Sequence, residues 1–422
     1  MKVAIIGGGI AGMTAAHLLR GRHEITLFER TGRLGGNAYT IDTKQGDAVD
    51  IAVAAFGRAG YRNFYKLLDQ VGVVPRISAG SFMSCHDLDT GRGVYIAPTP
   101  AGLLAQRFAM LGPSTLRSLW DLNEGITKLR WRLDAGKLAG QTLDEALAGV
   151  SEMRGTSKLA LPAARLLFLC ALCLLSSMSC DEVLAAPAEF FIGKLRTHHD
   201  VISPKAFWSV RCIHGGTRTY VEALAAGFRD RVELNARIRT VLRREDGVDL
   251  LMEDGARRAF DEVVMACNAD QALALLAEPT DREREVLGAW RYKDGRIVVH
   301  TDHSAFPPRP LMQAYTFLYR ERNGSMDTSV NGSLWFEPGV RKDCDYVSSQ
   351  HPNFPIRADR TEFETVLRTP IFDFAACKVQ RELPSLNGVR HTWHCGSHFG
   401  YGLHEDAVTS AIGVARGLGV EW

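Results

Sequence analysis

The sequence lacks a strong excess of charge of either sign, and its first residues do not have the pattern of a signal peptide. Its 50 lysines and arginines against 48 acids give a formal charge of +2, so nothing indicates a nucleic-acid partner. A strand-like run begins at residue 3, without the apolar segment and cleavage site of a signal peptide. Nine cysteines, an odd number, are scattered along 422 residues and are typical of reduced thiols. These features predict a cytoplasmic location.

The sequence also lacks an apolar run long enough to cross a bilayer. Its most apolar stretch is 159–178, where Leu166 to Leu175 contains no charge but Pro162 and Arg165 come before it. A membrane-spanning helix needs about 20 apolar residues. We therefore predict a buried helix beside a substrate cavity, with a segment that dips into the membrane as the alternative. Peripheral contact is the only membrane contact that we expect.

What the sequence does have is a glycine-rich start. An apolar strand-like run at 3–6 leads into the glycine sequence 7–12, a helical pattern at 13–19 and a second strand-like run at 24–28, which ends at Glu29. Strand, glycines, helix, strand and acid follow one another in the order of a dinucleotide-binding βαβ unit. The sequence therefore predicts a nucleotide cofactor at the start of the chain.

Each residue of this unit has an expected physical task. Gly7 permits the tight turn, Gly9 lets backbone approach a pyrophosphate, and Gly12 lets the helix pack closely on the strand. Glu29 is placed to accept hydrogen bonds from ribose hydroxyls, which argues against NADP. The helix start offers free N–H groups to the phosphates. The cofactor-binding residues expected here are Gly7, Gly9, Ile10, Ala11, Gly12 and Glu29.

A second glycine loop follows the acid directly, with the sequence RTGRLGGN from Arg30 to Asn37. It resembles the E-x-x-x-R-x-G-G-R/H motif of the flavoprotein superfamily that contains amine oxidases, phytoene desaturases and protoporphyrinogen oxidases. The resemblance implies that the glycines let the loop close over the pyrophosphate of FAD and that an arginine contributes charge. Asn37 stands where the family has a basic residue. The cofactor contacts implied are Arg30, Arg33, Gly35, Gly36 and Asn37.

The C-terminal segment is the second strong signal, because residues 392–418 read as strand, glycine loop and helix. Such a helix start attracts anions. The segment resembles the closing FAD motif of the superfamily, which implies that Gly396 and Ser397 approach the pyrophosphate and ribitol. The backbone of His404, Glu405 and Ala407 would face the pyrimidine end of the flavin ring. The sequence GYGLHEDAVTSA at 400–411 is most similar to the corresponding segment of bacterial NAD/FAD-binding amine-oxidase-like proteins associated with cyclopropane fatty acid synthesis.

Between these ends, periodicity predicts helices at 103–111 and 116–133, among others, and a mostly helical region from 100 to 200. Residues 232–242 read as one strand, the first of three strands up to residue 267. This region resembles the second part of the FAD domain, in which the strand near Ile238 presents backbone groups to adenine. An acid near Asp50 precedes, in relatives, a turn beside the flavin.

These patterns together predict an α/β fold: a Rossmann-type FAD-binding domain, with a GR2-like flavoprotein fold, interleaved with a mixed α+β substrate domain. The FAD-binding domain takes residues 1–85, 205–285 and 385–422, and the substrate domain takes 86–204, which is mostly helical, and 286–384, which forms a sheet.

Three histidines are the candidate catalytic residues. His214 precedes a glycine turn that, in relatives, lies near the flavin ring, and His398 and His404 lie in the C-terminal motif. A lone histidine is more often a structural residue, so each is a candidate only. No metal site is expected, because the CxxC pair of Cys170 and Cys173 has no second ligand pair beside it, and both thiols are interpreted as core residues.

The resemblance implies a FAD-dependent oxidase or dehydrogenase with a non-covalent flavin. The nine cysteines leave a covalent link open, and NAD is the alternative cofactor. Amine oxidases frame the substrate nitrogen with aromatic side chains, whereas Leu403 stands at the matching position, and neither Lys293 nor Arg296 aligns with their lysine. We therefore favour desaturation of a C–C bond in a small hydrophobic, lipid-like substrate, with O2 or another electron acceptor. The alternatives are oxidation of an amine to an imine, a double-bond isomerase without net redox change, and a flavin-binding scaffold without turnover.

Overall fold

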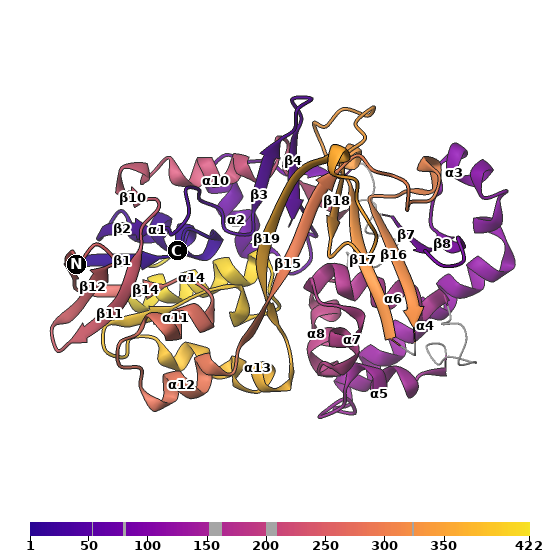
Figure 1. Ribbon diagram of the computed structural model, residues 1–422. Helices are drawn as coiled ribbons and strands as arrows, with labels where there is room; N and C mark the ends of the chain where they lie inside the picture. Colours follow the sequence, from indigo (N-terminus) through magenta and orange to yellow (C-terminus); the bar gives the residue numbers. More distant parts are fainter. Residues whose placement is uncertain (53, 79–81, 152–162, 200–208, 323–324) are drawn as a thin grey trace.

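The computed structural model describes residues 1–52, 54–78, 82–151, 163–199, 209–322 and 325–422. Two parts lie side by side in Figure 1, and the part that holds both chain ends is built from indigo, pink and yellow segments, which are far apart in the sequence. Three sequence expectations touch positions outside the described residues: the start of a strand pair at Gly80, the start of the apolar helix at Leu159, and Trp208 before the glycine turn.

A parallel sheet of five strands forms the centre of this part, in the order β10-β2-β1-β14-β20. Alternate residues of a strand face opposite sides of a sheet. Val3 and Ile5 accordingly pack into one hydrophobic cluster, whereas Ala4 and Ile6 pack into another. The sheet is thus covered on both faces, as the Rossmann-type prediction requires. The strands are β1 (Lys2–Ile6), β2 (Glu24–Phe28), β10 (Val232–Glu233), β14 (Glu262–Met265) and β20 (Thr392–His394).

The two covering layers differ in kind. Helices supply the cluster around Val3 and Ile5, and the first helix packs directly against the last one of the chain. A three-stranded antiparallel sheet supplies part of the other cluster, through Val241, Val248 and Phe260. The helices are α1 (Ile10–Leu19), α2 (Arg62–Gln70), α10 (Arg218–Ala225) and α14 (His404–Gly417), and the antiparallel strands are β11 (Ile238–Arg244), β12 (Gly247–Met252) and β13 (Arg257–Phe260).

The expectation of one strand over 232–242 is wrong. β10 ends at Glu233 on the edge of the parallel sheet, and β11 begins at Ile238 in the antiparallel sheet. Asn235 between them has a φ of 57°, a left-handed conformation that asparagine tolerates and a strand does not. Its N–H donates to the carbonyl of Thr31 over 3.0 Å. The break therefore holds the crossing segment against the loop after β2.

The second part contains a seven-stranded sheet in the order β19-β15-β18-β17-β16-β7-β8. All neighbours are antiparallel except β16 and β7. Its strands β15 to β19 lie within residues 286–384, where the sequence predicts a sheet, and β19, at one edge, is the longest of them. The strands are β7 (Met83–Asp87), β8 (Gly93–Tyr95), β15 (Arg291–His300), β16 (Tyr315–Arg322), β17 (Ser325–Ser333), β18 (Val347–Gln350) and β19 (Thr361–Ile371).

Helices pack below this sheet in Figure 1. The predicted apolar helix is α6, and its residues from Leu166 to Cys173 are buried. The expected helix at 103–111 is shorter, because Arg107 and Phe108 have φ values of 50° and 59° and interrupt it. No helix within the described ranges is long and apolar enough to cross a membrane. The helices are α3 (Pro100–Ala105), α4 (Pro113–Asp134), α5 (Leu143–Ala148), α6 (Ala163–Ser176), α7 (Cys180–Ala185) and α8 (Ala188–Thr197).

Smaller elements join the two parts. A two-stranded sheet of β3 and β4 follows the second glycine loop, and a three-stranded sheet, β5-β9-β6, brings residues 55–56 next to 211–212. The domain division of the sequence stays a proposal, with one refinement: β7 crosses the expected boundary at 85 and belongs to the larger sheet. The strands of these two sheets are β3 (Tyr39–Asp42), β4 (Ala48–Ala52), β5 (Ala55–Phe56), β6 (Arg76–Ile77) and β9 (Arg211–Cys212), and the remaining helices of the chain that the structure describes are α11 (Ala269–Leu275), α12 (Asp281–Gly288) and α13 (Phe374–Val379).

Substitution of Gly12 tests the packing of α1 on the parallel sheet. A Cβ at Gly12 would lie 2.0 Å from the carbonyl oxygen of Gly7, so the backbone has to move. We expect G12A to lower the free energy of unfolding by about 3 kcal/mol or to prevent folding. G413A in α14 is the matched control, because a Cβ there meets nothing within 4 Å; it should be neutral or stabilise by about 0.5 kcal/mol. Thermal unfolding of both variants measures the difference, and equal midpoints would contradict the prediction.

Candidate functional site

The first glycine loop has the geometry of a ligand cradle. Gly7 has a φ of 115°, which favours glycine, and a Cβ there would lie 2.7 Å from the carbonyl oxygen of Ala266. A Cβ at Gly9 would meet nothing closer than 4.0 Å. Space therefore remains beside Gly9, at the start of α1, where Ile10 and Ala11 form the first helical turn with N–H groups that lack an intrahelical partner.

The second glycine loop closes against the first. The N–H of Gly35 donates to the carbonyl of Gly8 over 2.8 Å, and a Cβ at Gly36 would lie 3.0 Å from the Cα of Gly9. Arg33 braces this contact: its guanidinium donates to the carbonyl of Gly36 over 2.7 Å and lies 3.4 Å from the centre of the Tyr39 ring. Arg33 thus helps to hold the loop in shape, and the charge that the resemblance expects it to contribute stays a prediction.

Glu29 lies at the end of β2, beside both loops. Its carboxylate accepts hydrogen bonds from the N–H of Gly8 and from the N–H of Thr31, each over 2.8 Å. Carboxylate oxygens have further acceptor capacity, so the expected ribose contact stays a prediction. Arg30, next to it, is exposed. The N–H of Ala236 donates to the Glu29 carbonyl over 2.8 Å, which brings the start of β11, with Ile238, to the same region.

The C-terminal motif reaches the inside of the molecule through backbone. Gly396 is buried, and Ser397 and Leu403 line a cavity. Leu403 precedes α14, so the free N–H groups of that helix start point toward this region. Side chains of the motif have other tasks, since Glu405 accepts hydrogen bonds from the N–H groups of Asn63 and Phe64 over 3.0 and 2.8 Å at the start of α2. Ala407 is buried in the helical core.

The cavity has a volume of about 250 Å³ and lies between the two parts of the molecule. One wall comes from α6, a second from the large sheet, and a third from the C-terminal motif and Asn37, whose side chain also donates to the carbonyl of Arg368 over 3.1 Å. The lining is mostly apolar and aromatic, with carboxyl, hydroxyl and amide groups at intervals. Its residues include Asp50, Phe56, Tyr61, Ala171, Leu174, Leu175, Cys212, Tyr315, Glu337, His351, Phe372, Tyr401 and Leu403.

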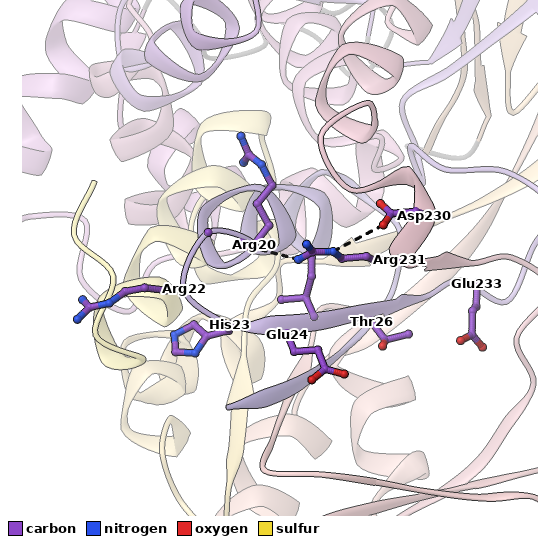
Figure 2. Close-up of a pocket in the computed structure, with 10 residues that line it drawn as sticks. Arg20, Arg22, His23, Glu24, Thr26, Asp230, Arg231 and Glu233 are labelled. Atoms are coloured by element: carbon purple, nitrogen blue, oxygen red, sulfur yellow. Dashed lines mark hydrogen bonds and ion pairs between the residues drawn. The ribbon is translucent and has the colours of Figure 1, made fainter.

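A larger hollow, of about 440 Å³, is an open groove beside the start of β2 (Figure 2). It is lined by charged side chains, and Arg231 is 4.0 Å from Asp230 and donates to the carbonyl of Arg20 over 3.1 Å. Ligands of parallel sheets bind at the carboxyl ends of the strands. The groove lies beside Glu24, the first residue of β2, and reaches only to Thr26 in the middle of that strand. It is therefore at the amino end of β2, whereas the nucleotide is expected at the carboxyl end.

A pair of carboxyl groups is the main polar feature of the cavity. The carboxylate of Asp50 accepts hydrogen bonds from the N–H and hydroxyl of Thr217, over 2.9 and 2.7 Å, and from the hydroxyl of Thr40 over 2.6 Å. The backbone N–H of Asp50 donates to Glu337 over 3.2 Å. Among the described residues, no lysine, arginine or histidine forms an ion pair with Glu337. Burial and the neighbouring Asp50 carboxylate raise the pKa of Glu337 well above its usual value.

The two carboxyl groups therefore hold their protons differently. Burial raises the pKa of Asp50, but the hydrogen bonds from Thr40 and Thr217 oppose this effect. Thr217 also precedes α10, where the helix dipole favours negative charge. Two close carboxyl groups cannot both ionise readily. Of the two carboxyl groups, Asp50 is therefore the easier to ionise, and Glu337 is the one that holds its proton to higher pH.

The three candidate catalytic histidines are not among the described residues that line the cavity. His404 is buried in the helical core, where the Tyr220 hydroxyl lies 2.9 Å from its Nε2, and burial lowers its pKa to about 4. His398 is buried with its ring centre 5.3 Å from that of Trp290. His214 is exposed beside Gly339. These positions argue against all three as catalytic residues. The sequence motifs predicted where the histidines lie along the chain, but they could not predict the direction of the side chains.

A buried lysine that the sequence did not single out connects two walls of the cavity. The ammonium group of Lys194 donates to the carbonyls of Leu175 and Tyr401, over 2.5 and 2.8 Å. Burial lowers its pKa to about 7, and burial raises the pKa of nearby Asp406 to about 6. Lys194 and Glu337 carry no local motif. The only signal in the sequence is a charged residue inside an apolar stretch, FFIGKL in one case and SLWFEP in the other.

The chain is similar to known proteins both in sequence and in fold. The profile of the family described as flavin containing amine oxidoreductase matches residues 10–337. Among curated relatives, zeta-carotene desaturase from Zea mays is 38% identical over 73 residues, which are 17% of this chain and 13% of that protein. Carotenoid phi-ring synthase from Streptomyces griseus is 32% identical over 131 residues, 29% of this chain and 25% of that protein. The chain thus spans about an eighth to a quarter of the length of these relatives.

Solved structures match over nearly the whole chain. A fatty acid isomerase from P. acnes has a TM-score of 0.69 at 18% identity, with 98% of each chain covered. Cyclohexylamine oxidase from Brevibacterium oxydans has a TM-score of 0.66 at 15% identity, with 99% of each chain covered. Putrescine oxidase bound to putrescine has a TM-score of 0.66 at 13% identity over 99% of each chain. At these identities the likeness shows the fold, which confirms the predicted flavoprotein architecture.

The proton on Glu337 predicts a dependence of stability on pH. Its pKa in the folded protein lies above the value of 4.5 expected for an exposed glutamate, so stability is full below that pH and falls as the pH rises toward the folded-state pKa. E337Q is neutral at every pH and lacks this decline. We therefore expect the unfolding midpoint of E337Q to rise relative to the wild type from acid to neutral pH. Parallel pH profiles would contradict the proton assignment; E24Q, on the exposed start of β2, is the control.

His404 predicts the opposite dependence in the acid range. Its pKa falls from 6.5 to about 4 on folding, so stability is full above pH 6.5 and is lost as the pH falls toward 4. H404Q keeps a partner for the Tyr220 hydroxyl but does not titrate. Its unfolding midpoint should fall less on acidification than that of the wild type, measured by circular dichroism. Equal slopes would mean that the ring is protonated in the folded protein, as an accessible base would be.

Proposed function

The chain belongs to the family of flavin-containing amine oxidoreductases, and on this basis we propose that it is a FAD-dependent enzyme that desaturates a C–C bond of an apolar, lipid-like substrate. The observation that carries the proposal is the cavity wall: Ala171, Leu174 and Leu175 of α6 line the same cavity as Leu403, which directly precedes α14. Leu403 takes the place at which aromatic side chains would frame a substrate nitrogen. An uncharged chain fits such a surface better than an ammonium group does.

The family implies FAD, and the residues present fit it. The open space beside Gly9, the free N–H groups at the start of α1 and the backbone at Ser397 would hold its pyrophosphate and ribitol. The start of α14 would place positive potential near the reactive ring. FAD, when bound, supplies a two-electron acceptor for hydride. We propose a non-covalent site, and the electron acceptor, O2 or another, belongs to the proposal as well.

The chain's own groups have two tasks in this proposal. Phe372, Leu174 and Leu403 orient the substrate and exclude water, because their side chains form the cavity wall. Desaturation releases hydride from one carbon and a proton from its neighbour. The Asp50–Glu337 pair holds one proton and one negative charge, so it can take up the proton that leaves. Tyr401 completes the wall, and Lys194 fixes its backbone.

Oxidation of an amine to an imine is the second candidate. Two observations favour it: the negative charge on Asp50 would attract a substrate ammonium group, and Tyr401 and Phe372 supply aromatic rings beside Leu403. A double-bond isomerase is the third, because return of the hydride needs the same cavity. A role in cyclopropane fatty acid synthesis stays a prediction of the sequence, since the relatives compared give it no support. A cytoplasmic location is likewise part of the proposal.

The first experiment separates these candidates. The purified protein should show a flavin spectrum that moves to the supernatant on heat precipitation. Unsaturated fatty acyl compounds, rather than amines, should then bleach the flavin under anaerobic conditions, and the product should have lost two hydrogens. An unchanged product mass would indicate isomerisation, and bleaching by amines alone would favour the second candidate. A colourless protein that cannot be reconstituted with FAD would contradict the whole proposal.

A variant of the cavity wall gives a quantitative test. L174N places an amide where the proposal puts the substrate chain, at a loss of about 1.4 kcal/mol in burial energy. We expect KM for an acyl substrate to rise about tenfold, with a smaller change in kcat. V74N is the matched control, because Val74 is 75% exposed on a loop away from the cavity. Equal KM values for both variants would place the substrate elsewhere.

A further inference from the structure

Large apolar side chains are exposed on one continuous segment of the substrate part. Within the described ranges, six of the 13 exposed large hydrophobic residues lie between 104 and 131, so they are concentrated in one place. We name them the α3–α4 patch. Its members, with their exposed fractions, are Leu104 (69%), Phe108 (56%), Leu111 (54%), Leu116 (54%), Trp120 (63%) and Trp131 (60%).

The exposed residues of α4 do not belong to a face that packs loosely against the protein. Ile126 and Leu129 are buried in the main hydrophobic cluster, so the helix already has an apolar face against the protein. Leu116 and Trp120 are spaced i and i+4 and share another face. In Figure 1, α3 and α4 lie at the end of the molecule away from both chain ends. The patch is therefore a second apolar face, turned outward.

Basic residues accompany the patch. The segment 99–137 has six lysines and arginines against three acids, a net charge of +3, whereas the whole chain has +2. The rest of the chain is thus slightly negative, and the excess positive charge lies here. Lys137 has its ammonium group 4.3 Å from the centre of the Trp131 ring, and Arg107 is exposed between Leu104 and Phe108. Asp121 is paired with Arg117 at 2.8 Å.

We propose that the α3–α4 patch docks on the surface of a lipid bilayer that contains anionic lipids. Tryptophan, leucine and phenylalanine side chains flanked by cations are the composition that inserts into the interfacial layer of a membrane. Lysines and arginines near the surface add attraction to anionic headgroups. With charges spread along its length, α4 would lie in the plane of the interface.

The position of the patch connects it to the cavity. Ile126 and Leu129 of α4 belong to the same hydrophobic cluster as Leu167 and Cys170 of α6, and α6 lines the cavity through Leu174. A docked protein would therefore hold its cavity one helix away from the lipid. This link to a lipid substrate rests on the proposed function, but docking itself does not.

Co-sedimentation with vesicles tests the proposal, using the full-length protein without substrate. We expect binding to vesicles of phosphatidylcholine and phosphatidylserine, and weaker binding to phosphatidylcholine alone or at high salt. The double variant L116S/W120S should bind at least tenfold more weakly. V366S is the control, because Val366 is 55% exposed on β19, outside the patch. Equal binding of the double variant and wild type, or no binding to the mixed vesicles, would overturn the proposal.

Two further measurements distinguish membrane insertion from self-association of the chain. Brominated lipids quench the fluorescence of tryptophans that insert into a bilayer, and we expect this quenching for the unmodified protein in mixed vesicles. The W131F variant should show less quenching. Light scattering after size exclusion reports self-association: a dimer that the double variant dissociates, together with no vesicle binding, would assign the patch to a second copy of the chain and overturn the membrane proposal. Since vesicle binding is measured without turnover, a protein that binds vesicles but is not bleached by acyl compounds would contradict the proposed function alone.

Discussion

The structure depends on one buried carboxylate. Asp50 follows the second glycine loop, yet its oxygens accept hydrogen bonds from Thr217, which is 167 residues later and begins α10. Its backbone N–H binds Glu337, another 120 residues on. A buried carboxylate without such donors would be costly, so three distant segments are held where its hydrogen bonds are satisfied. The β3–β4 sheet, the start of α10 and the segment that follows β17 meet at this point, and Asp50 and Glu337 both line the cavity.

The same interaction sets the electrostatics of the cavity. Burial, together with the Asp50 carboxylate that Thr40 and Thr217 stabilise, raises the pKa of the neighbouring Glu337. The interior thus presents a carboxylic acid, hydroxyl groups and apolar side chains, rather than a cluster of free charges. Lys194 likewise holds distant segments together, because its ammonium group donates hydrogen bonds to the carbonyls of Leu175 and Tyr401, which line the cavity. These carbonyls lie where regular secondary structure ends and therefore need a donor of this kind. Polar contacts of high sequence separation shape a cavity that is otherwise hydrophobic.

The sequence predicted well what depends on local constraint. Gly7 and Gly12 were identifiable because a left-handed φ at Gly7 and a contact of 2.0 Å at Gly12 exclude residues with a side chain. Such local requirements are visible in the sequence as glycines at fixed spacing. The roles of Glu337 and Lys194 were not predictable, since their partners lie 287 and 207 residues away. The histidines show the limit of motifs: His404 occupies its expected place, but its ring turns to Tyr220 and the core. A periodic pattern also could not reveal that Asn235 divides one apparent strand between two sheets.

The interleaving of the chain has a consequence for biosynthesis. The parallel sheet lacks β14 until residue 265 has been made and β20 until residue 394 has been made. Helix α1 packs on α14, and the start of α2 waits for Glu405, 342 residues after Asn63. Contacts of such separation form slowly, and an unpaired edge strand is prone to aggregate. The glycine-rich segment is made long before these partners and is therefore among the last to reach its final packing, and this part of the molecule cannot fold as an independent unit during translation.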